Sequence, residues 1–264
     1  MQDWIILSPS KEMDWSLGDQ APYLDPSAKK IIEKLRSLSQ EVLTDWLGLD
    51  QDLGQKIYQA YQDIDKAQAK PAIDLYQGLV FRQIERNLAL SDFGRNHLLI
   101  LSALYGPVGP QTPINPYRLD FTKALQVEGE SLKSLQKKNY TKKLAASRIY
   151  NLASQEFAQR IDKKALASWV DINFYKTWKD KKKAPSATAK KLRGQLAQHI
   201  LTRESLDMEV FEDFQFERYR LNSASSHENL IYSLDWEKRE NLKIKPWLFP
   251  RPWVYSYMLW NRRQ

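Results

Sequence analysis

The sequence predicts a mixed α/β (α+β) fold in a single domain, with central strands surrounded by helices. Short apolar runs typical of buried strands are interspersed irregularly with amphipathic stretches typical of helices, and no internal repeat or long linker interrupts them. Hydrophobic residues make up 42% and aromatic residues 12% of the 264 residues, which is enough to bury a sizeable core.

The N-terminal half predicts a strand, two helices and one ambiguous segment. WIILS at 4–8 is a short apolar run that ends at Pro9, as a buried strand would. Apolar residues at helical spacing, after Asp25 or Ser27 as N-cap, predict the first helix. The two helices are expected over residues 26–47 and 51–66. HLLILSALY at 97–105 fits a central strand or a buried helix equally well.

The C-terminal half predicts four strands and two helices. The strands are expected at 148–154, 167–175, 214–221 and 229–234, with the last two forming a hairpin. Ser154 caps a short helix with Glu156 in its first turn. Ser186 caps a longer helix over 187–201, whose apolar stripe leaves Lys190, Lys191 and Arg193 standing off it.

The composition excludes several classes of chemistry. The chain has no cysteine, which excludes disulfides, cysteine-ligated metals and thiol nucleophiles. Its three histidines lie far apart without ligand spacing, and no dinucleotide-binding, P-loop or nucleophile-elbow motif occurs, so neither a metal site nor a cofactor is expected. With no secretory N-terminus and no run of about 20 apolar residues, the sequence favours a cytoplasmic protein without a membrane partner.

Positive charge is concentrated in one part of the chain. The formal net charge is +8, and residues 133–193 carry 17 lysines and arginines against 4 acidic residues. Such a segment attracts a polyanion, although lysine-rich helix faces are often only solvated surface and a protein partner is a further alternative.

A second group of polar residues follows the ends of predicted strands. Lys11, Arg118, Asp120 and Glu156 form this candidate pocket, in which the two cations would meet phosphate oxygens and the acids would orient them. If the four converge, the alternative function is an enzyme acting on a small anionic substrate, with lysine as the plausible nucleophile.

Six short segments resemble the YaaA-like peroxide-stress family, in the same order and over residues 1 to about 234. They are SPSKEMD at 8–14, LYQGLV at 75–80, SALYG at 102–106, PYRLD at 116–120, NLASQE at 151–156 and KKLRG at 190–194. The resemblance implies a bacterial protein linked to hydrogen peroxide resistance, with a family-specific fold, a helix–hairpin–helix element and a basic cleft that binds duplex DNA.

The helix–hairpin–helix would begin with HLLILSALYGPVGP at 97–110, where Gly106 would let the backbone approach a phosphate. The alternative for this segment is a core strand followed by a proline-rich loop. The expected function is sequence-independent DNA binding in the response to oxidative stress. The predicted nucleic-acid-binding residues are Gly106, Lys137, Lys138, Lys142, Lys143, Lys181, Lys182, Lys183, Lys190, Lys191 and Arg193.

The chain also departs from the family it resembles. Gln136 stands near a tryptophan common in the family, and Asn222 stands near an expected acid. Residues 235–264 extend beyond the usual family end and interleave aromatic residues with lysine and arginine, so we treat 1–234 as the domain and 235–264 as an extension. Its aromatic residues could stack on bases, pack on the domain or mediate self-association.

Overall fold

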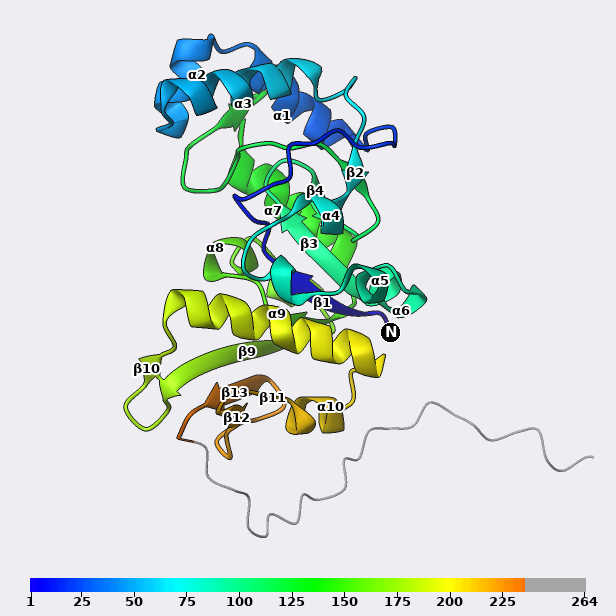
Figure 1. The fold of residues 1–264 in the computed structure, drawn as a ribbon, viewed down its shortest axis with the longest axis vertical. Coiled ribbons are helices and arrows are strands. Elements are labelled where there is room, and N and C mark those ends of the chain that lie inside the picture. The colour runs from blue at the N-terminus through cyan, green and yellow to red at the C-terminus, as the bar shows by residue number, and fades with distance from the viewer. Residues whose placement is uncertain (236–264) are drawn as a thin grey trace, which may run out of the picture.

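A nine-stranded sheet runs through the middle of the molecule (Figure 1). The structure is a computed structural model that describes residues 1–235, and it confirms the predicted mixed α/β class. The strands follow the order β11-β12-β13-β9-β8-β1-β3-β4, with β10 also paired to β9. Their bounds are β1 Asp3–Leu7, β3 Leu98–Ser102, β4 Gly106–Val108, β8 Arg148–Asn151, β9 Ser168–Thr177, β10 Lys182–Lys183, β11 Gln215–Phe216, β12 Tyr219–Leu221 and β13 Asn229–Ser233.

The central part of this sheet is parallel. The pairs β13–β9, β9–β8, β8–β1 and β1–β3 are parallel, and the outer pairs are antiparallel. Strand β1 lies between β8 and β3, and its residues Ile5, Ile6 and Leu7 are fully buried, as expected where helices cover both faces of a parallel sheet. The strands predicted near 4–8, 148–154 and 167–175 are therefore confirmed, and β12 and β13 form the predicted C-terminal hairpin. The single strand predicted at 214–221 is instead two short strands, β11 and β12, which pair with each other.

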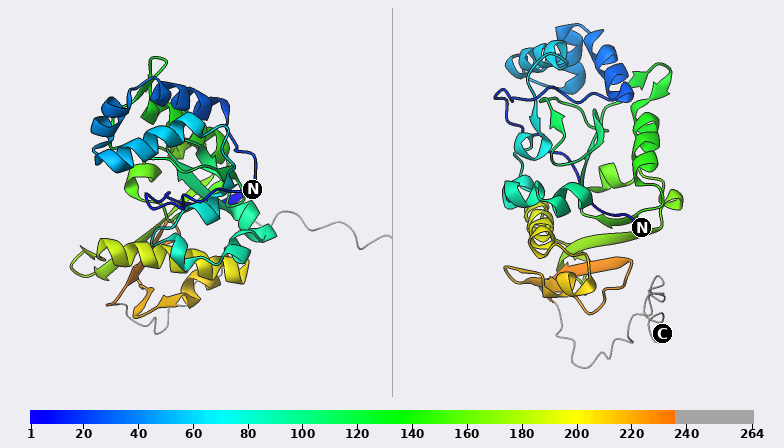
Figure 2. Two further views of the ribbon diagram at one scale, coloured as in Figure 1. Left: turned by 45° about the horizontal axis from the view of Figure 1, so that its top comes forward. Right: turned by 90° about the vertical axis from the view of Figure 1, so that its right-hand side faces the viewer.

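Helices cover both faces of the sheet, and α7 and α9 lie on opposite sides of it (Figure 2, right). The longer helices are α1 Pro26–Arg36, α2 Gln40–Leu47, α3 Gln51–Asp63, α7 Leu132–Leu144 and α9 Ser186–Arg203. The shorter ones are α4 Ala72–Leu75, η1 Phe81–Gln83, α5 Arg86–Ala89, α6 Asp92–His97, α8 Gln155–Ala158, η2 Lys163–Ala165 and α10 Met208–Asp213. Two small two-stranded sheets pair β2 Lys70–Pro71 with β5 Pro113–Ile114, and β6 Gln126–Val127 with β7 Glu130–Ser131.

The helix predicted over 26–47 is two helices. Asp25 caps α1 by accepting a hydrogen bond from the backbone N–H of Ala28, at 2.7 Å. The helix ends at Ser37, and Ser39 then caps α2 through the backbone N–H of Val42. Apolar spacing does not reveal this break, because a serine can cap a new helix without interrupting the apolar pattern.

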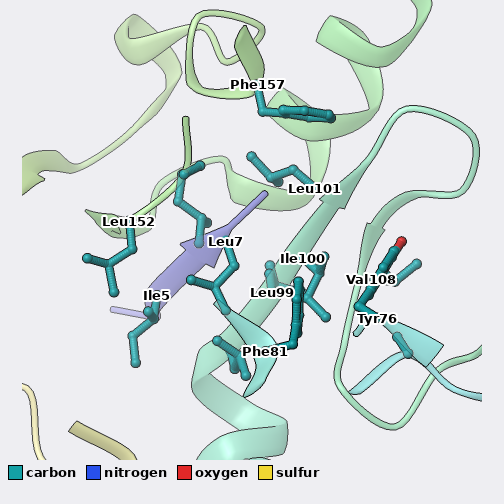
Figure 3. Close-up of a cluster of buried hydrophobic side chains, with 14 of the residues drawn as sticks. Ile5, Leu7, Tyr76, Phe81, Leu99, Ile100, Leu101, Val108, Leu152 and Phe157 are labelled. Atoms are coloured by element: carbon teal, nitrogen blue, oxygen red, sulfur yellow. The ribbon is translucent and has the colours of Figure 1, made fainter. Parts of the chain in front are cut away.

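The core is packed between β1, β3 and the segments that follow β1 and β8. Figure 3 shows Ile5 and Leu7 of β1 beside Leu99 of β3, with Phe81 and Phe157 from outside the sheet completing the cluster. The ends of β1 and β8 are therefore anchored in a well-packed interior.

Residues 97–110 form a β-hairpin, so their interpretation as the first helix and hairpin of a helix–hairpin–helix is wrong. Ser102 ends β3, and its Oγ accepts hydrogen bonds from the backbone N–H groups of Leu104 and Tyr105, at 3.2 and 3.0 Å. This turn leads to Gly106, whose φ of +76° favours glycine, and then into β4. The alternative of a core strand is confirmed, because β3 is buried along its whole length.

Gly106 is also buried, beside Gln136 of α7 and Asp25. Burial of this glycine argues against the predicted approach of its backbone to a phosphate, which stays a prediction. Gln136 donates from Nε2 to the carbonyl oxygens of Ala103 and Leu104, and so holds the hairpin turn rather than a ligand.

Two sequence predictions concern other parts of the chain. The predicted aromatic and basic extension, apart from Asp235, lies outside the described residues, and so does the predicted self-association through it. In the described part of the chain, no helix combines the length and the apolar character that a membrane crossing needs.

Candidate functional site

The order of the strands creates a crevice at one edge of the sheet. From β1 the chain passes to β3 on one side, whereas from β8 it passes to β9 on the other side, and β1 and β8 are neighbours. The segments that follow β1 and β8 therefore diverge from adjacent strand ends. In open parallel sheets, ligands bind at such a switch point, outside the carboxyl ends of the strands.

A cavity of about 380 Å³ lies at this point. Its walls come from the segments after β1 and β8, the loops at 78–81 and 117–120, and the first turns of α9. The four residues of the predicted pocket, Lys11, Arg118, Asp120 and Glu156, all line it. Lys190 and Arg193, predicted to bind nucleic acid, line the same cavity.

Two serines join the strand ends beneath the cavity. Ser8 follows β1 and Ser154 follows β8, and the backbone N–H of Ser154 donates to Ser8 Oγ at 2.7 Å. The backbone N–H of Leu152 donates to the carbonyl oxygen of Ile6 at 3.1 Å, which extends the pairing of the two strands. The two walls of the cavity are thereby held at a fixed separation.

Buried tyrosines hold the loop that carries Arg118 and Asp120. Tyr117 Oη lies 2.8 Å from Ser102 Oγ, which donates to it, and 2.9 Å from Tyr76 Oη. Tyr61 donates from Oη to the carbonyl oxygen of Arg118 at 2.8 Å. Burial raises the pKa of Tyr117 to about 12, so its hydroxyl stays protonated and keeps these hydrogen bonds at neutral pH.

The acids of the cavity already have partners. Lys11 Nζ and Asp120 Oδ2 form an ion pair at 2.8 Å. Burial opposes the charged form of Asp120, but hydrogen bonds from Lys11 and Thr122 outweigh it and hold the pKa of this carboxyl below its usual range. Glu156 Oε1 accepts a hydrogen bond from the backbone N–H of Phe121 at 2.9 Å, which ties the loop to α8.

Three cations of the cavity have no acidic partner among the described residues. Arg118, Lys190 and Arg193 make no ion pair with any side chain of residues 1–235. The Nε of Arg193 is buried and has no hydrogen-bond partner in that range, and burial lowers the pKa of this guanidinium. Burying this guanidinium costs free energy unless an anion or a hydrogen-bond acceptor replaces the water that it loses.

The sequence predicted that Arg193 lies on the solvent-exposed face of its helix, away from the apolar stripe, but it does not. It is only partly exposed and lines the cavity, whereas Lys190 and Lys191 are exposed as predicted. The next residue, Gly194, explains this position: a Cβ there would collide with the carbonyl oxygen of Val80. Because no side chain separates the two backbones, α9 packs tightly against the loop at 78–81.

Apolar side chains complete the cavity. Leu79, Phe81, Leu119, Leu152 and Phe157 all contribute to its lining. The site thus combines positive charge with an apolar wall, a combination that suits a ligand with an anionic group and a less polar body.

The other predicted nucleic-acid-binding lysines lie in two separate places. Lys137, Lys138, Lys142 and Lys143 are exposed on α7, on the opposite side of the sheet from α9. Lys181, Lys182 and Lys183 are exposed at the β9–β10 hairpin, directly before α9. The basic segment 133–193 is therefore not one continuous surface, because the sheet separates its two ends.

Several lining residues were not among the predicted site residues. Ser8, Ser10, Tyr117, Leu152 and Ser154 line the cavity, and each belongs to one of the short segments that carry the family resemblance. Five of those six segments contribute to the lining, and the sixth, at 102–106, supports Tyr117 through Ser102. The segments contained these residues, but the predicted pocket was limited to charged side chains.

Fold and site together define a mixed α/β protein with a partly uncompensated cationic cavity at the switch point of a largely parallel sheet. The family model described as peroxide stress protein YaaA matches residues 4–225, so the chain belongs to that family.

Bacterial relatives are similar over most of their length. A UPF0246 protein of Streptococcus gordonii is 33% identical over 227 residues, covering 81% of this chain and 92% of the relative. UPF0246 proteins of Teredinibacter turnerae and Francisella tularensis subsp. novicida are 29% and 28% identical, covering 84% and 86% of this chain and 95% and 98% of the relatives. The predicted family resemblance is confirmed.

Proposed function

We propose that this protein binds duplex DNA without sequence preference, through the face that carries the cavity, as part of the response to hydrogen peroxide. The observation that carries the proposal is that Arg118, Lys190 and Arg193 line one site and have no acidic partner in the part of the chain that the structure describes. Membership of the peroxide stress family supports the biological setting.

The β9–β10 hairpin extends the positive charge beyond the cavity. Lys181 and Lys182 are exposed there, and the hairpin lies beside the start of α9 (Figure 1). Lysine and arginine contacts to phosphates fix a protein on DNA but carry no sequence information. Binding through these residues would therefore be alike for all sequences.

A fluorescence-anisotropy titration of a labelled duplex from about 50 to 200 mM salt tests this proposal, because each neutralised phosphate contributes about 0.9 to the slope of log affinity against log salt. The triple variant Lys181→Gln, Lys182→Gln and Lys190→Gln should lower that slope by about two to three. The matched control removes equal charge from α7, as Lys137→Gln, Lys138→Gln and Lys142→Gln, and should bind nearly as the wild type does. Equal losses in the two variants would show that DNA does not favour the cavity face.

The second candidate function is an enzyme acting on a small anionic substrate. The observation in its favour is that Lys11, Arg118, Asp120 and Glu156 line one cavity. The ion pair between Lys11 and Asp120 weakens it, because an ammonium held by a carboxylate is not a free amine nucleophile. DNA binding therefore remains the function that we favour.

A further inference from the structure

We propose that the cavity binds the terminal phosphate of a nucleotide, with the attached nucleoside against its apolar wall. The ligand class is a nucleoside monophosphate, either free or as the phosphorylated end of a DNA strand. This inference rests on the proposed DNA-binding function in one respect. The exposed lysines at the rim of the cavity would contact the backbone of a duplex, whereas the interior would hold the phosphorylated end of a strand.

The size of the site separates these two roles. A cavity of about 380 Å³ falls within the range of about 300–1,000 Å³ that holds small ligands. An intact duplex keeps its bases stacked inside and its phosphates spread over a wide surface, so it meets the exposed lysines of the rim. A nucleotide enters such a pocket only when it is free, terminal or extruded from the stack.

The charge of the site favours a monoester over the diesters of an intact strand. A phosphate monoester carries about −1.5 to −2 charges at pH 7, whereas an internal diester carries a single charge. Acids also line the cavity, but Arg118, Lys190 and Arg193 have no ion-pair partner within residues 1–235. Two of them are guanidinium groups, which bind phosphate oxygens in pairs.

Arg193 offers a buried donor for such an anion. Its Nε is buried without a hydrogen-bond partner in residues 1–235, although the side chain lines the cavity. Its neighbour Lys191 is exposed on the same helix and does not line the cavity. A phosphate seated beside Arg193 would supply the missing acceptor.

The remaining lining suits a nucleoside. Leu79, Leu152 and Phe157 present an apolar wall against which a flat base can pack. Ser10 lines the same cavity and offers a hydroxyl for the polar edge of a sugar or base. Inorganic phosphate alone would leave these apolar side chains without a ligand contact.

Calorimetric titration of the full-length protein with deoxyadenosine 5′-monophosphate, deoxyadenosine and inorganic phosphate tests the ligand class. In parallel, anisotropy measurements compare one duplex with 5′-phosphate, 3′-phosphate or hydroxyl ends. We expect the monophosphate to bind at least tenfold more tightly than either of its parts, or the phosphorylated duplex to bind more tightly than the hydroxyl form. The first result indicates that the ligand is a free nucleotide, and the second that it is the end of a strand. Either result supports the proposal that the cavity binds a terminal phosphate.

Arg193→Gln and the matched control Lys191→Gln remove the same charge from neighbouring positions. The loss of a charged hydrogen-bond pair should weaken binding of the phosphorylated ligand by about 10- to 100-fold in Arg193→Gln. Lys191→Gln should stay within about twofold of the wild type. Arg118→Gln is a second cavity variant should Arg193→Gln fold poorly by circular dichroism, and it carries the same expectation.

A closed DNA circle without ends separates this proposal from the proposed function. If the circle binds with a steep salt dependence but no terminal phosphate or monophosphate adds affinity, the cavity proposal is overturned and duplex binding stands. If the monophosphate binds but the circle does not, the cavity proposal stands and general duplex binding fails. Equal loss of ligand affinity in Arg193→Gln and Lys191→Gln also overturns the cavity proposal.

Discussion

Helices α7 and α9 carry similar positive charge in the sequence but lie in different electrostatic surroundings. On α7, Lys138 pairs with Glu130 at 2.7 Å, Lys137 lies 4.0 Å from Asp162, and Lys143 lies over the ring of Trp4. On α9, Lys190 and Arg193 face a cavity in which no acid of residues 1–235 pairs with them.

The difference teaches that a count of charges along the chain does not locate a binding site. Exposed lysines beside acids are largely neutralised by their neighbours and by solvent. Cations that share a cavity and have no ion-pair partner retain a stronger field for an incoming anion. The first two experiments below change the cavity region and use the α7 region as the control, and the third compares a cavity variant with the wild type.

The largest expected effect concerns the packing that places Arg193 in the cavity. Gly194→Ala should lower the free energy of unfolding by about 2–3 kcal/mol, because the new methyl group collides with the backbone of Val80 and α9 must shift. Gly129→Ala, in the turn before α7, should cost about 1 kcal/mol, because Gly129 has a φ of +82° but open space around it. Urea denaturation measures both.

Ligand binding by the same two variants separates a local shift of α9 from a general loss of stability. Gly194→Ala should also weaken nucleotide and DNA binding at conditions where the protein remains folded, whereas Gly129→Ala should leave both unchanged. If Gly194→Ala proves as stable as the wild type, α9 does not depend on close backbone contact at this point.

A smaller effect is expected from removing an acid next to a cation in each region. Asp120→Asn releases Lys11 from its ion pair inside the cavity, and should strengthen anion binding about three- to tenfold at low salt. Glu130→Gln releases Lys138 on α7, and should change the affinity less than twofold. Anisotropy titrations in matched buffers compare them, and an equal gain in both variants would remove the distinction between the two regions.

The smallest effect is on stability in acid. The pKa of Asp120 in the folded state lies below its value of about 3.9 in an unfolded chain. The ion pair with Lys11 therefore stabilises the fold fully above that unfolded value, and this contribution is lost as the pH falls through the folded value.

Wild type should therefore exceed Asp120→Asn in stability by about 1 kcal/mol or less at pH 7, and the difference should shrink below about pH 4. Thermal unfolding between pH 7 and pH 3 measures it. A difference that persists unchanged at pH 3 would show that Asp120 acts through packing rather than through its charge.

Most elements of the fold could be predicted from local patterns. The strands near 4–8, 148–154 and 167–175 were evident because a buried parallel strand is a short, almost uninterrupted apolar run. The segment 97–105 could not be assigned, because a strand and a buried helix share that pattern. Pairing of β3 with β1 decided it, and that contact spans more than 90 residues of sequence.

The candidate site was predicted in part. Lys11, Arg118, Asp120 and Glu156 were grouped because each follows a strand or turn, and the cavity brings them together. Gly106 lies in a buried turn, and in sequence such a glycine looks the same as one that approaches a phosphate. Whether these residues bind a ligand remains a prediction.

The sequence by itself determined the class of fold, the family, the chemistry that the chain lacks and the residue types that could meet an anion. These properties follow from composition and from patterns within about 20 residues. Only the tertiary structure decided which cations keep an uncompensated charge. That depends on the strand order, which places the ends of β1 and β8 side by side and leaves α7 on the far side of the sheet. The field at a site depends on distance and burial in space, and neither is proportional to separation along the chain.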